Sequence, residues 1–174
     1  MKKIAIAVLL SAIAAPVFAE GMYAGVNLGQ NKYDFAGAGI SGAAKDTSTV
    51  VGILGGYAIN KNFAAEAAYT SLGSVDVGGG NTVKSSVLSL SGVGSFPIND
   101  QFSLFAKVGL AQSKVEATGQ ASKTKSGTTF GIGGQYNVTS AIGIRVGYDK
   151  YKVGANPSID INTSVMSVGG VFKF

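Results

Sequence analysis

Residues 164–174 read Ser-Val-Met-Ser-Val-Gly-Gly-Val-Phe-Lys-Phe and close the chain. Alternate positions differ in character: one side carries the larger apolar groups (Met166, Val168, Phe172, Phe174). A period of two with one apolar side predicts a β-strand. An uncovered apolar strand at a chain end would aggregate unless both of its edges were paired. We therefore expect this strand to close a set of earlier strands.

An internal repeat indicates how many strands there are. Tyr57, Phe96 and Tyr136 each precede a short polar turn after which an apolar residue restarts the chain, and they lie 39 and 40 residues apart. Phe174 lies 38 residues beyond Tyr136. Each unit of this length accommodates one hairpin, so four units predict eight strands, at about 22–31, 49–57, 63–71, 86–96, 102–112, 128–136, 142–150 and 164–174. A propeller also repeats near this period, but each blade needs four short strands where these units hold two long ones.

The alternation also predicts which side faces the interior. Glu66, Lys107 and Arg145 share one side with Gly and Ser, whereas the bulky apolar residues occupy the other, with Leu54, Val93 and Phe105 as exceptions. A soluble barrel would point its apolar groups inward. The opposite pattern, in a chain that is 46% hydrophobic and 13% charged, predicts an all-β, eight-stranded antiparallel up-and-down transmembrane β-barrel.

Aromatic residues and connection lengths agree with this fold. Two interface belts are expected at the ends of the strands, formed by Tyr57, Phe63, Tyr69, Phe96, Phe102, Tyr136, Tyr148, Phe172 and Phe174. Long polar connections, at about 32–48, 72–85, 114–127 and 151–163, alternate with the short turns. Outer-membrane barrels have short periplasmic turns and longer outer loops.

The N-terminus has the features of a cleaved secretory signal. Two lysines precede an apolar run at 4–13, and Val17-Phe18-Ala19 resembles a signal peptidase site. We expect a signal peptide at 1–19 and a single barrel domain at 20–174. The formal charge of +5 includes the two leader lysines, so nucleic acid is not an expected partner.

Several segments together resemble the outer-membrane protein A-like family of eight-stranded barrels, which includes the small neisserial surface protein and opacity-type porin family proteins. They are Met-Tyr-Ala-Gly-Val-Asn-Leu-Gly (22–29), Gly-Gly-Tyr-Ala-Ile-Asn (55–60), Phe-Ala-Ala-Glu-Ala-Ala-Tyr (63–69), Phe-Pro-Ile-Asn-Asp (96–100), Ile-Arg-Val-Gly-Tyr (144–148) and the terminal Phe-Lys-Phe. The resemblance implies a Gram-negative outer-membrane location and a terminal aromatic that is recognised by the barrel assembly machinery. The sequence departs from the longer members of the family in one respect: no peptidoglycan-binding domain is expected after the barrel, so cell-wall tethering is not an expected function.

The residues that could carry chemistry form two groups. A lumen charge network of Glu66, Lys107, Arg145 and Gln135 is expected, with Glu66 and Arg145 facing each other and Lys107 between them. This network is either a structural plug or a gate. A loop basic cluster of Lys114, Lys123 and Lys125 is either a solvated surface or a contact for anionic groups such as lipopolysaccharide phosphates.

Without His or Cys, a serine nucleophile lacks its usual base, and a transition metal lacks its usual ligands, so no enzyme activity and no cofactor are expected. We expect a structural barrel whose interior is too narrow for a permanent pore and whose mobile outer loops serve as surface antigen, adhesin or ligand-binding platform. A small diffusion channel and a soluble periplasmic binding barrel are the alternatives. Expected partners of a monomeric barrel are membrane lipids, lipopolysaccharide, the assembly machinery and host surface molecules.

Overall fold

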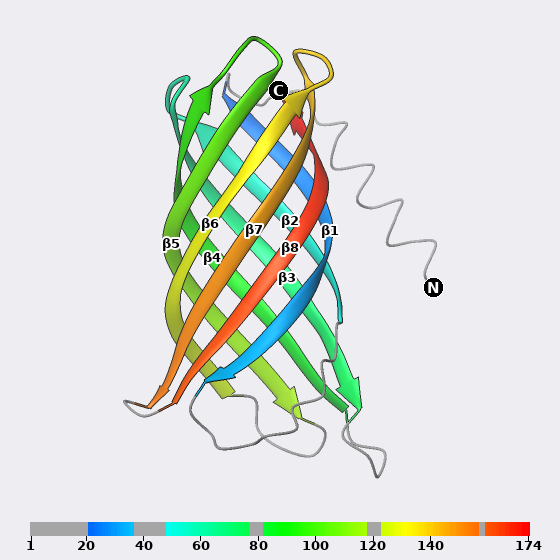
Figure 1. Ribbon diagram of the computed structural model, residues 1–174, viewed down its shortest axis with the longest axis vertical. Helices are drawn as coiled ribbons and strands as arrows, with labels where there is room; N and C mark the ends of the chain where they lie inside the picture. Colours follow the sequence, from blue (N-terminus) through cyan, green and yellow to red (C-terminus); the bar gives the residue numbers. More distant parts are fainter. Residues whose placement is uncertain (1–20, 37–47, 77–81, 118–122, 157–158) are drawn as a thin grey trace.

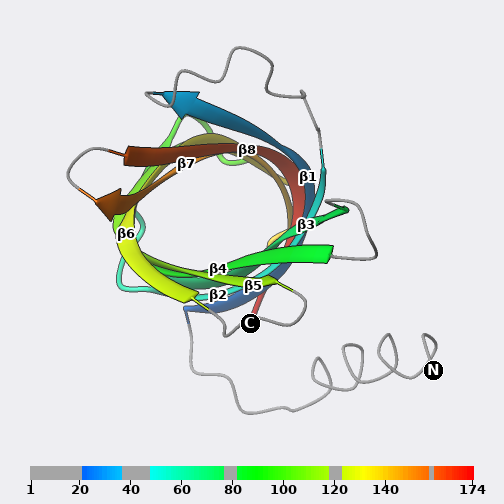
Figure 2. The same cartoon turned by 90° about the horizontal axis from the view of Figure 1, so that it is seen from below.

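Eight strands form one closed antiparallel barrel in the computed structural model, which describes residues 21–36, 48–76, 82–117, 123–156 and 159–174. The strands are β1 (Met22–Ala36), β2 (Thr49–Ala58), β3 (Phe63–Asp76), β4 (Thr82–Pro97), β5 (Phe102–Ala117), β6 (Lys123–Asn137), β7 (Ile142–Asn156) and β8 (Ile159–Lys173). Each strand pairs with its sequence neighbour, and β8 pairs with β1 to close the sheet. Figures 1 and 2 show the tilted strands from the side and the ring that they form. The predicted fold class is confirmed, and the propeller is excluded.

The side-chain alternation follows the predicted direction. Outward positions hold exposed apolar residues such as Leu104, Val108 and Ile144, whereas Glu66 is only 2% exposed. Leu54, Val93 and Phe105, the exceptions to the pattern, are buried. A wall of exposed apolar groups around buried charges is the arrangement that lipid outside and a small polar interior require.

The apolar band ends at a similar place on every strand. Toward the loop end, each strand has a last exposed apolar residue, after which the next outward position is polar; these last residues are Leu28, Val51, Tyr69, Leu88, Leu110, Phe130, Tyr148 and Met166. Most of the predicted belt residues (Tyr57, Phe63, Phe96, Tyr136 and Phe172 near the short turns, Tyr69 and Tyr148 at the far edge) are exposed on this wall. The terminal Phe174 stacks edge-on against Phe172, with ring centroids 4.9 Å apart.

Except for β2, which begins at Thr49 as predicted, the strands extend beyond their predicted ends on the loop side. For example, β5 reaches Ala117 and β6 begins at Lys123, so the predicted loop at 114–127 is largely strand. Beyond the apolar band the first outward positions are polar, so the period-two contrast that marks a strand weakens. Backbone pairing continues there without that signal.

The short turns explain the sequence repeat. In the turn at 59–62, Asn60 Oδ1 accepts hydrogen bonds from the backbone N–H groups of Asn62 and Phe63, both at 2.8 Å. Asn99 Oδ1 accepts the equivalent pair in the turn at 98–101, at 2.9 and 2.7 Å. Thr139 Oγ1 does the same in the turn at 138–141, at 3.2 and 2.9 Å. A side-chain oxygen that caps two N–H groups is the device of Asx and related turns.

Replacing Asn60 or Asn99 with Ala should therefore lower the free energy of unfolding by about 1 kcal/mol each, because two backbone donors lose their acceptor. Urea titration of the folded barrel in phospholipid vesicles measures this change. Lys61→Ala, at an exposed position of the same turn as Asn60, provides the control. An equal effect of all three substitutions would contradict the role assigned to the two turn residues.

Candidate functional site

Glu66 on β3 is the centre of the polar interior. Its Oε2 accepts hydrogen bonds from the Tyr23 hydroxyl on β1, at 3.1 Å, and from Arg145 Nη1 on β7, at 2.5 Å. Its Oε1 lies 3.6 Å from Lys107 Nζ on β5. Residues from four strands thus meet at one carboxylate across the lumen, and a buried carboxylate of this kind needs such partners to offset its desolvation.

Asp149 is a member of the network that sequence reasoning missed. Its Oδ1 lies 3.0 Å from Lys107 Nζ, and the residue is 5% exposed. Lys107 therefore bridges Glu66 and Asp149, rather than lying between Glu66 and Arg145 as predicted. The sequence did contain a signal for it: Asp149 is at an odd-numbered position, which places it on the same inward side of β7 as Arg145. With it, two carboxylates balance two cations in this part of the lumen.

Arg145 connects the charges to a polar chain that leads toward the short turns. Arg145 Nε donates to Gln135 Oε1 at 3.2 Å, and Gln135 Nε2 donates to Asn137 Oδ1 at 2.9 Å. Lys173 Nζ also donates to Asn137 Oδ1, at 2.8 Å. The guanidinium carbon lies 4.8 Å from the Phe105 ring centroid, within range of a cation–π interaction.

Inward-facing glycines make room for these side chains. A Cβ on Gly56 would lie 2.2 Å from the Tyr23 ring, and one on Gly131 would lie 2.1 Å from Asp149 Oδ1. Both contacts are far shorter than van der Waals separation. In a barrel of eight strands the interior is only wide enough for side chains. A long side chain on one strand therefore fits in the lumen only where the adjacent strand has a glycine beside it.

A second layer fills the lumen nearer the loop end, and we call it the apolar plug. It is a cluster of buried residues contributed by six strands: Val50, Leu72, Val87, Ala111, Tyr151 and Val165. Beside it, Asn31 on β1 is fully buried and binds β3 and the residue before β2: its Nδ2 donates to the Leu72 carbonyl at 3.0 Å, and its Oδ1 accepts from the Ser48 N–H at 3.0 Å. Sequence reasoning missed the plug, although Val87 and Val165 are apolar residues at odd-numbered positions, which face inward on their strands.

The lumen has a cavity at the short-turn end. This cavity has a volume of about 640 Å³ and extends from Lys61, Asn99 and Asp100 at the turns to Arg145 in the charge network. The charge network and the apolar plug both stand between this cavity and the loop end. Because this cavity lies at the short-turn end, that end of the lumen can hold water and small solutes.

The predicted basic cluster is divided between the two faces of the sheet. Lys114 on β5 is exposed at an outward position, whereas Lys125 on β6 is half-buried at an inward position. Lys123 is the first residue of β6 and pairs with Val115. These residues therefore lie in strand ends rather than in a loop. They remain neighbours in the sheet, because Lys125 pairs with Ser113 and Lys114 with Thr124.

The structure offers no metal site in the part of the chain that it describes: no three His, Cys, Asp or Glu residues are placed to hold an ion there. Among the described residues, there is no helix that is long and apolar enough to cross a membrane. The predicted signal peptide at 1–19 lies outside the described residues.

The sequence matches the outer membrane protein beta-barrel domain family over residues 5–174. The chain belongs to this family. It is accordingly a bacterial outer-membrane barrel, and the soluble periplasmic alternative is wrong. No curated protein matches the chain in sequence.

Solved barrels share the fold at low sequence identity. Neisserial surface protein A is 20% identical, with a TM-score of 0.70 over 91% of this chain and 100% of that one. The Yersinia pestis attachment invasion locus protein, crystallised with the heparin analogue sucrose octasulfate, is 17% identical, with a TM-score of 0.59 over 88% of this chain and 100% of that one. The N-terminal barrel domain of Pseudomonas aeruginosa OprF is 16% identical, with a TM-score of 0.60 over 88% and 98%.

Removing the central carboxylate tests whether the charge network stabilises the barrel. Glu66→Ala should lower the free energy of unfolding by about 3 kcal/mol, because Arg145 and Lys107 lose their shared buried partner. The double variant Glu66→Ala/Arg145→Ala should recover part of that loss, since one unpaired charge is removed with its partner. Urea titration in vesicles measures both variants. Unchanged stability of Glu66→Ala would show that the network does not contribute.

Proposed function

We propose that this protein is a structural outer-membrane barrel that presents its loop end to the outside as an adhesive, antigenic or ligand-binding surface. The observation that supports this proposal most directly is the double filling of the lumen. The charge network around Glu66 and the apolar plug around Tyr151 both cross the interior. A barrel whose interior is filled with side chains meets partners through its outer surfaces.

The competing function is a small diffusion channel gated by the charge network. Lys107 contacts both Glu66 and Asp149, so the lysine can leave one carboxylate and keep its pairing with the other. Such a change would leave the apolar plug in place. A gate would therefore have to move Leu72 and Tyr151 as well, which makes the channel the weaker proposal.

Conductance distinguishes the two functions. The purified barrel in a planar bilayer should show no steady openings, and Arg145→Ala should not create a channel of defined size while the apolar plug remains. Tyr151→Phe, which keeps the ring in the plug, is the matched control. Steady openings of the unmodified protein whose size changes in Arg145→Ala would favour the channel instead.

A polyanionic partner is our proposal for the adhesive surface. The basic cluster lies at the loop end of β5 and β6, where the strands emerge from the apolar band. The attachment invasion locus protein, which shares this fold, was crystallised with a heparin analogue. Sulfated polysaccharide on a host surface has the chemistry to bind such lysines, because cationic groups gathered at one end of the barrel attract a polyanion.

Retention on immobilised heparin tests this proposal. The triple variant Lys114→Gln/Lys123→Gln/Lys125→Gln should elute at lower salt than the unmodified protein, because three positive charges are lost at the loop end. Lys61→Gln, at the short-turn end, should elute with the unmodified protein. Identical elution of all three proteins would exclude the basic cluster as the binding surface.

A further inference from the structure

Two lysines occupy the lipid-facing side of β7 immediately beyond the apolar band. Tyr148 is the last apolar outward residue of that strand, and Lys150 and Lys152 hold the next two outward positions. Within the described part of the chain, neither ammonium group has an ion pair with a carboxylate. Cations at a membrane interface are favourable where they reach anionic lipid headgroups.

A groove in the outer wall leads up to these lysines. It has a volume of about 890 Å³ and runs from Phe63 near the short turns to Lys150 near the loop end. Its floor includes Gly92, Gly94 and Ala106, whose side chains are absent or small. Larger residues, Ile132 and Tyr148 among them, line it. We call this hollow the wall groove.

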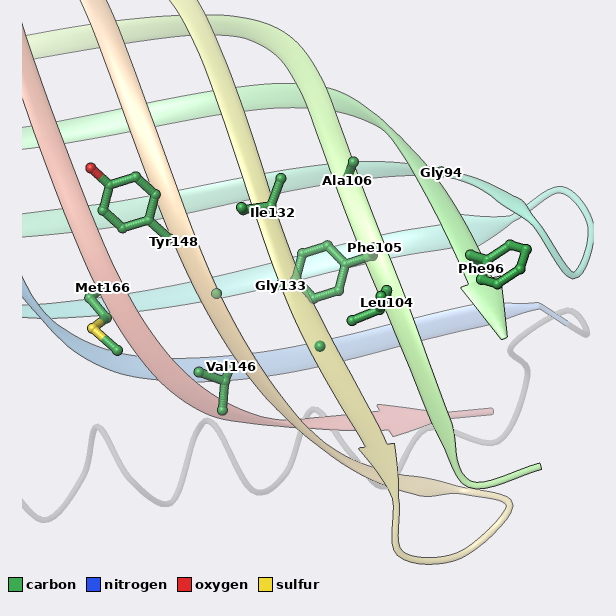
Figure 3. A pocket seen from close by; sticks show the side chains of 12 residues that line it. Gly94, Phe96, Leu104, Phe105, Ala106, Ile132, Gly133, Val146, Tyr148 and Met166 are labelled. Carbon is green, nitrogen blue, oxygen red and sulfur yellow. The ribbon is translucent and has the colours of Figure 1, made fainter. Parts of the chain in front are cut away.

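A second hollow of about 630 Å³ adjoins the wall groove. It shares Gly94, Ala106, Ile132 and Tyr148 with that groove and continues over β7 to Met166 on β8. Figure 3 shows the side chains of Leu104, Ile132, Val146 and Tyr148 around Gly133. The lining is almost wholly apolar, so lipid acyl chains are suited to both hollows.

We propose that the wall groove and its two lysines form a binding site for the lipid A part of lipopolysaccharide. One acyl chain lies in the wall groove, and phosphate groups of the headgroup contact Lys150 and Lys152. Lipid tails are as apolar as this wall, so the chain is held by close van der Waals packing against the glycine floor rather than by a hydrophobic gain. The lysines select the headgroup by charge.

The number of phosphates and acyl chains, and the position of the lysines at the loop end, favour lipid A over a phospholipid. Lipid A carries two phosphates and several acyl chains, which correspond to two successive lysines and two adjoining hollows. A phospholipid with one phosphate and two chains leaves part of this surface unmatched. The lysines also lie at the loop end, which in this family faces the outer leaflet, where lipopolysaccharide resides.

Native mass spectrometry of the delipidated full-length barrel in detergent tests the site with purified diphosphoryl lipid A as the probe. Lys150→Gln/Lys152→Gln should weaken binding about tenfold, given the attraction that each lysine adds at an anionic headgroup. Monophosphoryl lipid A should bind the unmodified barrel more weakly than the diphosphoryl form. Lys61→Gln, an exposed lysine at the opposite end, should leave the affinity unchanged.

Filling the wall groove tests the acyl contact separately. Gly94→Leu should reduce lipid A binding, because the added side chain occupies the floor where a Cβ meets no atom closer than 3.9 Å. Gly170→Leu is the matched control: it is also on the outer wall, and a Cβ there has no atom within 4 Å. Heat-modifiability on a gel establishes that each variant is folded.

Either of two results would overturn the proposal. Unchanged lipid A affinity in Lys150→Gln/Lys152→Gln would show that the lysines do not hold the headgroup. Equal affinity of the unmodified barrel for phosphatidylglycerol would identify a phospholipid as the occupant. If Gly94→Leu did not fold, the lysine variant and the phosphate comparison would still decide the question.

Discussion

Backbone hydrogen bonding in lipid is the constraint on which the rest of this structure depends. A sheet inside a bilayer has no water to satisfy an open edge, so its first and last strands must pair. Here β1 pairs with β8 from Tyr23 to Ala36. That closure leaves no open edge and sends alternate side chains to lipid and lumen. With eight strands, it also limits the interior to a width that side chains can fill.

The narrow lumen in turn dictates the polar chemistry inside. Glu66, Arg145, Lys107 and Asp149 come from three strands that are distant in sequence, and each charge is near one of the opposite sign. Unpaired charges would be costly in this setting. Glycines at Gly56 and Gly131 provide the space. The interior therefore acts as a core, with ion pairs and an apolar plug in place of a uniformly apolar packing.

Because the interior is a core, the recognition that we propose takes place on the exterior. Two parts of the exterior are distinctive: the loop end, with lysines at the ends of β5 and β6, and the wall over β4–β7, where small residues leave a groove below Lys150. Both place positive charge beyond the apolar band, at the level of the anionic outer leaflet. The same positive charge suits a polysaccharide partner outside the cell and a phosphorylated lipid within the membrane.

The sequence alone determined the eight strands, their turns and the direction of the wall, because the period of two and the repeat of about 39 residues are local properties of the chain. It also placed Glu66, Arg145 and Gln135 in one lumen. Only the tertiary structure decided that Lys107 bridges to Asp149, that Asn31 binds the Leu72 carbonyl, and that Val87 and Tyr151 belong to one plug. These contacts join strands that are not neighbours in the sheet, or fix its loop end, and they depend on tilt and register around the closed barrel. Alternation gives the side of the sheet that a residue faces, but not its partner across the lumen.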